Sequence, residues 1–136
     1  MQSIKSIIFI LLILITAFLS CKKESMQSES ETEFITVAGF TYGKYNGEWY
    51  HVSDGEKGDR AELDRLIVKP QAGIDMYNFN YESVGVQTLS IVRELSGGYY
   101  ILDTSELDDP FDAAIKLWNT GNFEYIQFSA LLEVTK

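Results

Sequence analysis

A single cysteine, Cys21, closely follows a long apolar run and limits how this chain can fold. Residues 7–15 are apolar without a break, and a basic residue, Lys5, precedes them. A cationic start, an apolar stretch and a small residue before the cleavage point are typical of a secretory signal. We therefore expect residues 1–20 to be removed and to take no part in the fold. Because the chain has no second cysteine, no disulfide within it can hold the domain together.

The residues at the end of this signal indicate how the protein is anchored. Leu19-Ser20-Cys21 resembles the lipobox of bacterial lipoproteins, although Phe18-Leu19 departs from its commonest order. The resemblance implies that the Cys21 thiol carries a diacylglycerol, and two or more acyl chains hold a protein durably on a bilayer. The alternative is an uncleaved membrane anchor, but residues 7–19 are short for a span that needs about 20 apolar residues. We expect a lipid-anchored protein of the cell envelope, on its periplasmic or outer-surface side.

The segment after the cysteine has the composition of a tether. Residues 22–33 contain no apolar side chain except Met26, and such polar segments bury too little apolar surface to fold. Residues 21–33 are therefore predicted to be the lipidated cysteine and a flexible tether. Residues 34–136 are predicted to form a single α+β domain.

The charge of the mature chain excludes one class of partner. All twenty Asp and Glu residues follow Cys21, and the formal net charge of the chain is −9. Nucleic-acid binding requires a cationic surface. We therefore expect no nucleic-acid partner, and solubility accounts for most of the acidic excess.

The first part of the domain is rich in β-branched and aromatic residues. Residues 34–53 predict a β-hairpin, because Asn46-Gly47 is a strong two-residue turn signal. Residues 53–62 are polar and glycine-containing, and they predict a loop. Residues 71–84 fit either a short helix or an irregular loop. The remaining predicted strands of this part are Leu63–Lys69, ended by Pro70, then Val86–Glu94, a turn at Gly97-Gly98, and Tyr99–Leu102.

A helix and a final strand close the domain. Asp109 suits the N-cap, Pro110 the first helical position and Asp112 the first turn. Gly121 is predicted to end the helix. Helical spacing puts one set of residues on a common buried face: Phe111, Ala114, Ile115 and Trp118. The final strand, residues 123–134, puts another set on one side: Ile126, Phe128, Ala130 and Leu132.

The order of these elements predicts a fold. From residue 63 to residue 134 it is strand, possible helix, strand, strand, helix, strand, which is the split βαβ or ferredoxin-like order. We expect an antiparallel sheet with its helices on one face, preceded by the hairpin. The other face of the sheet is then available for binding.

The sequence offers little catalytic chemistry. His51 is the only histidine, and it lies in an aromatic strand where a surface or edge role is the more common one. The chain has no nucleophile elbow, phosphate loop or His/Cys metal cluster. Asp54, Glu56 and Asp59 alternate with glycines but do not match a calcium loop, so a solvated loop is favoured. We expect a non-enzymatic protein without a cofactor or metal ion.

Several motifs in the second half of the domain occur in an order that is known from one family. They are the strand Leu66–Pro70, the strand pair 92–102, the helix start at Asp109-Pro110 and the run Gly121-Asn122-Phe123-Glu124-Tyr125. In this order, residues 64–129 resemble the N-terminal prodomain of subtilisin-like serine proteases, especially the fervidolysin type. The family usually places a proline soon after the Glu-Tyr pair, whereas Ile126-Gln127-Phe128 stands there in this chain.

The resemblance implies a function. Such prodomains template the folding of a protease and then inhibit it by occupying its cleft. The short stretch after Tyr125 leaves no room for a protease domain, so we expect a stand-alone inhibitor or the same fold reused. In the inhibitor, the sheet face would dock on a subtilisin-like protease and a tail would enter the cleft: Glu133, Val134, Thr135 and Lys136. The alternative is an envelope lipoprotein that uses this fold for an immunity-type or assembly contact unrelated to proteases.

Overall fold

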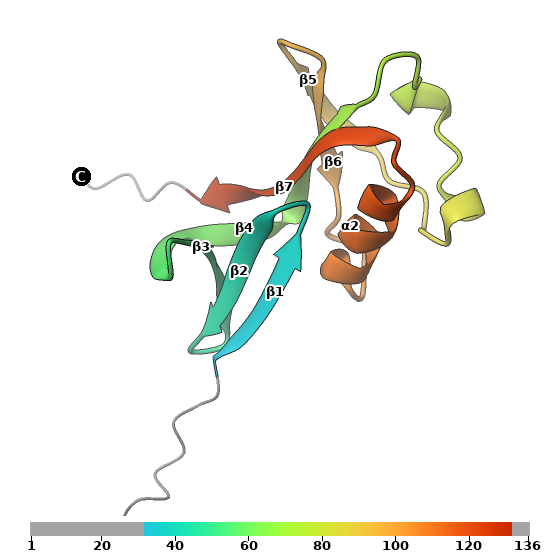
Figure 1. Cartoon of the computed structure of the whole chain (residues 1–136). Coiled ribbons are helices and arrows are strands. Elements are labelled where there is room, and N and C mark those ends of the chain that lie inside the picture. The colour runs from blue at the N-terminus through green and yellow to red at the C-terminus, as the bar shows by residue number, and fades with distance from the viewer. Residues whose placement is uncertain (1–31, 132–136) are drawn as a thin grey trace, which may run out of the picture. The chain divides into compact units, whose positions relative to one another are not determined.

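The computed structural model describes residues 32–131, which form an α+β domain as predicted. A mostly antiparallel sheet of seven strands packs against one α-helix of the described chain (Figure 1). The strands are β1 (Glu33–Val37), β2 (Phe40–Tyr45), β3 (Glu48–Ser53), β4 (Glu56–Pro70), β5 (Ile91–Leu95), β6 (Tyr99–Asp103) and β7 (Phe123–Leu131). The helices are the 3-10 helices η1 (Met76–Asn78) and η2 (Glu82–Val84) and the α-helix α2 (Pro110–Asn119).

The N-terminal segment is a three-stranded meander rather than the predicted two-stranded hairpin. The turn at Asn46-Gly47 is confirmed, with φ angles of 51° and 81°. A second turn, at Ala38-Gly39, has φ angles of 53° and 85° and divides the predicted first strand into β1 and β2. Alanine carries a steric penalty at positive φ and is not a typical hairpin-turn residue. Ala38 therefore does not predict a turn at this position.

The polar loop predicted for residues 53–62 is wrong. A tight turn at Asp54-Gly55, with φ angles of 52° and 78°, is followed at once by β4, which continues for 15 residues to Pro70. The first residues of β4 are charged and exposed, so they lack the alternation that marks a half-buried strand. They are extended because they pair with neighbouring strands, and strand formation depends more on such context than on propensity.

The long strand β4 is the centre of the sheet. The strand order is β1-β2-β3-β4-β6-β5, and β7 also pairs with β4. On one side of β4, β3 pairs with its first half (Tyr50↔Arg60) and β6 with its second half (Leu66↔Leu102). β7 pairs with both halves of β4, with an irregularity between Glu62 and Leu66.

Two backbone carbonyls of this irregularity accept hydrogen bonds from one buried residue. Thr104, which follows β6, donates from its hydroxyl to the carbonyl oxygen of Leu63 at 2.6 Å and from its backbone N–H to that of Asp64 at 3.0 Å. Thr104 is the one polar residue that is buried among the described residues, and both of its donors have carbonyl acceptors. A buried carbonyl without a partner costs about 1–3 kcal/mol, so this residue stabilises the bend in β4.

The start and the end of α2 agree with the prediction. The Asp109 side chain accepts a hydrogen bond from the backbone N–H of Asp112 at 3.0 Å, and Pro110 is the first helical residue. The chain leaves the helix through Thr120 and then Gly121, whose φ is 72°.

The predicted buried face of α2 is only partly correct. Phe111 and Ala114 are buried as expected, but Ile115 and Trp118 are 37% and 36% exposed. The buried stripe is instead completed by Leu117, together with Ala113. The helix therefore faces the core with the side that carries Ala113, Ala114 and Leu117, and Ile115 and Trp118 lie at the border of this side.

Residues 71–90 contain no α-helix and no strand. Of the two alternatives for residues 71–84, the irregular one is correct, with the short helices η1 and η2 in it. The strand predicted to begin at Val86 begins at Ile91. Val86 and Leu89 are both buried although they are three residues apart, a spacing that a regular strand cannot place on one face.

The meander is joined to β7 through a buried tyrosine of β2. The Tyr42 hydroxyl accepts a hydrogen bond from the backbone N–H of Phe128 at 3.0 Å. Its ring lies 5.3 Å from that of Phe111 on α2 and 5.6 Å from that of Phe128. Ile126 and Phe128 are buried on the side of β7 that the alternation predicted, whereas Leu132 lies outside the described residues. The core therefore contains side chains of the meander, α2 and β7, together with side chains of β4, β6 and residues 71–90.

Candidate binding surface

Two sets of residues singled out from the sequence lie outside the described part of the chain. Cys21, the predicted lipid attachment site, precedes it, and the predicted cleft tail of Glu133, Val134, Thr135 and Lys136 follows it. β7 extends to Leu131, the last described residue. Between residues 32 and 131, no helix has the length and apolar character needed to cross a membrane.

His51 has structural contacts. Its ring lies 5.0 Å from the ring of Tyr42, and its Nε2 lies 3.4 Å from the carbonyl oxygen of Ser129 on β7. Asp54 belongs to the β3–β4 turn, while Glu56 and Asp59 lie on β4, all exposed. Within the described range, no three His, Cys, Asp or Glu side chains are grouped closely enough to hold a metal ion.

The strands β5, β6, β4 and β7 present one face away from α2, which we call the open face. Leu66, Val68 and Ile126 point to the core side and are fully buried. Their neighbours along each strand point to the opposite side, because side chains alternate between the two faces of a strand. The strand registers arrange these neighbours in two rows. In the first row Leu95 lies opposite Tyr99, and Lys69 lies opposite Tyr125. The second row runs across all four strands: Arg93, Ile101, Ile67 and Gln127.

The first row of the open face is aromatic with a cation in its middle. The rings of Tyr99 and Tyr125 are 5.5 Å apart, and the Nζ of Lys69 lies 5.5 Å from the Tyr99 ring centre. Lys69 also pairs with Glu124 at 2.9 Å, and this hydrogen-bonded contact raises the pKa of the lysine. Phe40 of β2 lies 5.3 Å from Tyr125 and borders the row. The row therefore offers two half-buried tyrosine rings beside a lysine that stays charged.

The second row is apolar at its centre and charged toward one side. Ile67 and Ile101 are half-buried side by side. Arg65 pairs with Asp103 at 3.5 Å next to them. The pKa of Asp103 is lowered by hydrogen bonds from Ser105 and, to a smaller extent, by the Arg65 charge. This face thus combines an apolar centre with three cations, Arg65, Lys69 and Arg93, and the first two are paired with carboxylates.

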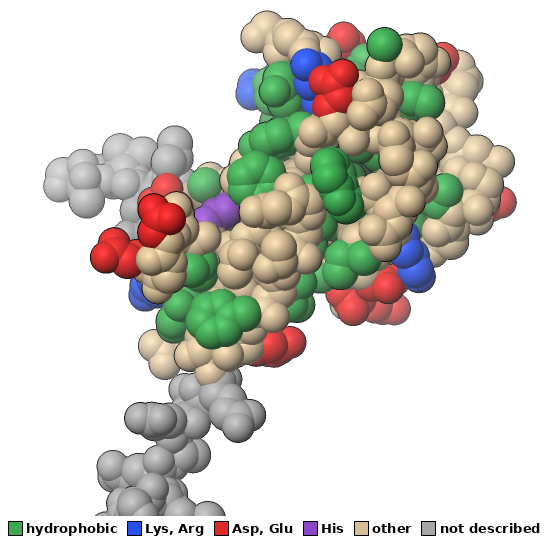
Figure 2. Space-filling model, in the orientation of Figure 1, with side chains coloured by type: hydrophobic (Ala, Val, Ile, Leu, Met, Phe, Trp, Pro, Cys, Tyr) green, Lys and Arg blue, Asp and Glu red, His purple; other side chains and the backbone are tan. Residues whose placement is uncertain are grey.

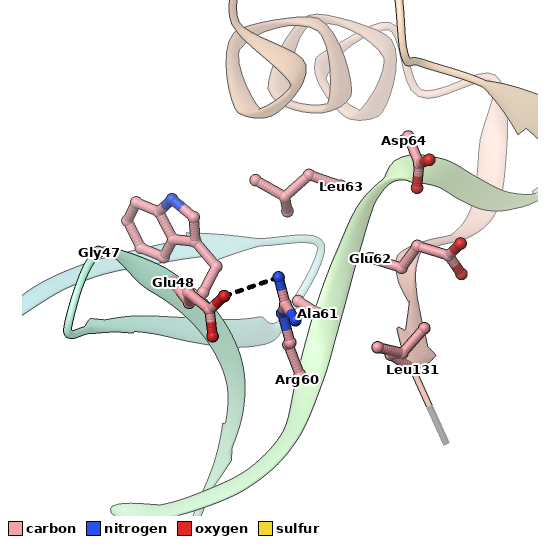
Figure 3. Close-up of a pocket in the computed structure, with 9 residues that line it drawn as sticks. Gly47, Glu48, Arg60, Ala61, Glu62, Leu63, Asp64 and Leu131 are labelled. Carbon is pink, nitrogen blue, oxygen red and sulfur yellow. Dashed lines mark ion pairs between the residues drawn. The ribbon is translucent and has the colours of Figure 1, made fainter. Parts of the chain in front are cut away.

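A depression of about 510 Å³ lies at the junction of β3 and β4 (Figure 3). An ion pair of 2.8 Å between Glu48 and Arg60 crosses it. Trp49, Leu63 and Leu131 contribute apolar walls, and Glu62 and Asp64 add two carboxylates. The lining of the depression thus combines apolar walls with three carboxylates and one arginine.

Comparisons of the chain with protein-family models, with curated proteins and with solved structures found no match.

The sequence predicted a free sheet face but not the residues on it. Which residues share a row depends on the irregularities between Glu62 and Leu66 and between Lys69 and Pro70. A shift of one residue in a strand moves its whole side-chain set to the other face. The only local signal for the face is the group of aromatic and β-branched residues around Ile67, Tyr99 and Tyr125.

Proposed function

We propose that this protein is a lipid-anchored, non-enzymatic binding protein of the cell envelope that docks a partner protein on its open face. The observation that carries the proposal is the pair of aromatic and apolar rows across β5, β6, β4 and β7. Large aromatic side chains with an apolar centre and flanking cations are the features that dominate binding energy at protein interfaces. A subtilisin-like serine protease is the candidate partner, because of the family that residues 64–129 resemble.

The arrangement of the strands supports the resemblance. From residue 56 onward the sheet order is β7-β4-β6-β5 with antiparallel pairing throughout. In this order β6 separates β4 from β5, as expected for a split βαβ unit. We assign the domain to a ferredoxin-like variant in which η1 and η2 stand in place of the first helix. In the prodomain family, the sheet face without helices is the face that docks on the protease, and here it is the open face.

The role of the tail depends on how β7 ends. In the proposed inhibitor, Glu133, Val134, Thr135 and Lys136 would occupy the substrate cleft in the manner of a cleaved product. β7 remains paired with β4 as far as Leu131, so the tail has few residues with which to reach a cleft. Affinity would therefore depend mainly on the preformed open face, which loses little conformational entropy on binding.

Inhibition assays test the open face. The full-length lipoprotein, solubilised in detergent, should competitively inhibit at least one member of a panel of subtilisin-like proteases acting on a small peptide substrate. Ile101→Lys places a charge in the centre of the open face and should weaken inhibition by about tenfold or more. Ile115→Lys makes the same change at an exposed position of α2 and should leave inhibition unchanged.

Two further variants separate the possible outcomes. Tyr99→Ala removes one ring from the open face with a smaller risk to folding, and melting temperatures show which variants remain folded. Removing residues 133–136 should weaken inhibition only if the tail enters the cleft. If no protease of the panel is inhibited, the protease assignment is wrong, and the immunity-type or assembly contact becomes the better hypothesis.

The lipid anchor is tested separately. Cys21→Ala removes the only thiol of the chain, so the precursor should take up no fatty-acid analogue during metabolic labelling and should no longer be processed normally. Cys21→Ser is a closer match in size and should behave in the same way. Label that persists on either variant would exclude Cys21 as the attachment site.

A further inference from the structure

A second aromatic surface lies on the meander, on the side turned away from α2. The rings of Phe34 and Tyr45 are 6.4 Å apart, and those of Tyr45 and Tyr50 are 5.8 Å apart. Phe34, Gly43 and Tyr50 lie opposite one another on β1, β2 and β3 and therefore share a face. We call Phe34, Tyr45 and Tyr50 the aromatic tip.

The aromatic tip closes over a glycine. A Cβ atom at Gly43 would lie 2.7 Å from the Tyr45 ring and 3.0 Å from the Phe34 ring. The absence of a side chain at this position thus allows the rings to pack into one continuous surface. Phe34 nevertheless remains 55% exposed, so the tip presents an apolar group that the domain itself does not cover.

The aromatic tip lies where the chain enters the domain. Phe34 is the second residue of β1, and Tyr45 directly precedes the Asn46-Gly47 turn. The start of β1 and this turn are at the same end of the meander (Figure 1). Figure 2 shows the surface of this end in the same orientation, with hydrophobic side chains in green. The segment that carries Cys21 joins the domain here, because β1 begins at Glu33.

A lysine and two ion pairs lie on or beside the strands that carry the aromatic tip. The Nζ of Lys57 lies 4.3 Å from the centre of the Tyr50 ring and 5.6 Å from that of Tyr45. Glu33 pairs with Lys44 at 3.8 Å, and Glu48 with Arg60 as described above. Glu33 and Glu48, which lie on the strands that carry the tip, thus each have a cationic partner.

We infer that the aromatic tip lies against the head-group region of the bilayer that holds the lipid anchor; this rests on the anchor being part of the proposed function. Tyrosine and lysine side chains suit the membrane interface, since their apolar parts enter it while their polar ends stay hydrated. The few rings of the tip would bind a membrane only weakly on their own. A tether that keeps them close to the surface raises their effective concentration and makes a weak contact persistent.

Site-specific labelling tests this orientation. Because Cys21 is the only cysteine and is acylated in the proposal, a cysteine introduced elsewhere can be labelled alone. The full lipidated chain is placed in vesicles of phosphatidylethanolamine and phosphatidylglycerol that contain a head-group-level spin-labelled lipid. A fluorophore at Thr36→Cys, beside the tip, should be quenched at least about twofold more than one at Ser96→Cys, in the distant β5–β6 turn.

Matched variants identify the cause of the quenching. Phe34→Ala should reduce quenching at position 36 to the level seen at position 96. Val92→Ala changes a similarly exposed apolar residue on β5, 48% exposed, and should have no effect. Equal quenching at positions 36 and 96 in the unchanged chain would overturn the inference. Vesicle flotation is measured in the same samples: a chain that does not float contradicts the anchor, whereas one that floats with equal quenching contradicts only the orientation.

Discussion

Leu117→Ala should lower the free energy of unfolding by about 2–5 kcal/mol, the range for removing a fully buried leucine. Leu117 has no solvent exposure and lies in the middle of the contact between α2 and the sheet. Trp118→Ala, one residue further along, should cost less, about 1–3 kcal/mol, because Trp118 is 36% exposed and its removal leaves no closed cavity.

Denaturant unfolding of both variants measures this difference. The comparison is sharp because neighbouring positions of one helix are changed to the same residue, so helix propensity contributes little to the difference. Lys116→Ala is a suitable third variant, since it removes an exposed ion pair with Asp112 and a long, exposed hydrogen bond to the Gly85 carbonyl oxygen, and should cost under about 0.5 kcal/mol. A larger cost for Trp118→Ala than for Leu117→Ala would mean that α2 faces the sheet with a different side.

This contrast also shows what the sequence could predict and what it could not. The start of α2 depends on Asp109 and Pro110, and the turn between β2 and β3 depends on Asn46-Gly47. These signals act within a few residues, so the sequence predicts both features correctly. The rotation of α2 about its axis is different, because it depends on how the helix packs against the sheet. Helical spacing alone fits two neighbouring stripes, one with Leu117 and one with Trp118.

For the strands too, short-range signals can be predicted from the sequence and long-range effects cannot. The first half of β4 is charged and is extended only because β3 and β7 lie on either side of it, which is a long-range effect. The turn at Ala38-Gly39 is likewise imposed by the pairing of β1 with β2. Which residues lie on the open face depends on the registers of four strands. The sequence could therefore predict only that one face of the sheet carries no helix. Cys21 and residues 133–136 remain predictions, because they lie outside the described residues.

Raising the pH from about 10 to about 12 should remove roughly 5 kcal/mol of stability, because two tyrosines are buried in the core. Burial raises the pKa of Tyr42 and that of Tyr81 from 10.0 to about 12. In the unfolded chain both hydroxyls lose their protons near pH 10, whereas in the folded protein they keep them until about pH 12. The stability is therefore fully present below pH 10 and is lost as the pH rises toward 12, at about 1.4 kcal/mol per pH unit for each tyrosine.

The two tyrosines should differ at neutral pH. The Tyr81 hydroxyl is buried without a hydrogen-bond partner, so Tyr81→Phe should leave stability unchanged or raise it by up to about 1 kcal/mol. The Tyr42 hydroxyl accepts from the backbone N–H of Phe128. Tyr42→Phe leaves that buried donor unsatisfied and should cost about 1–3 kcal/mol.

Urea unfolding of the wild type and of the single and double variants between about pH 8 and about pH 12 separates these effects. In each single variant, the loss of stability at alkaline pH should be about half of that in the wild type. The double variant should keep only the smaller contribution of residues such as Tyr125, because burial also raises the pKa of Tyr125. A double variant with the full wild-type decline would show that other groups control alkaline unfolding. The comparison therefore tests whether the closed core between the meander, α2 and β7, which holds Tyr42 in place, exists in solution.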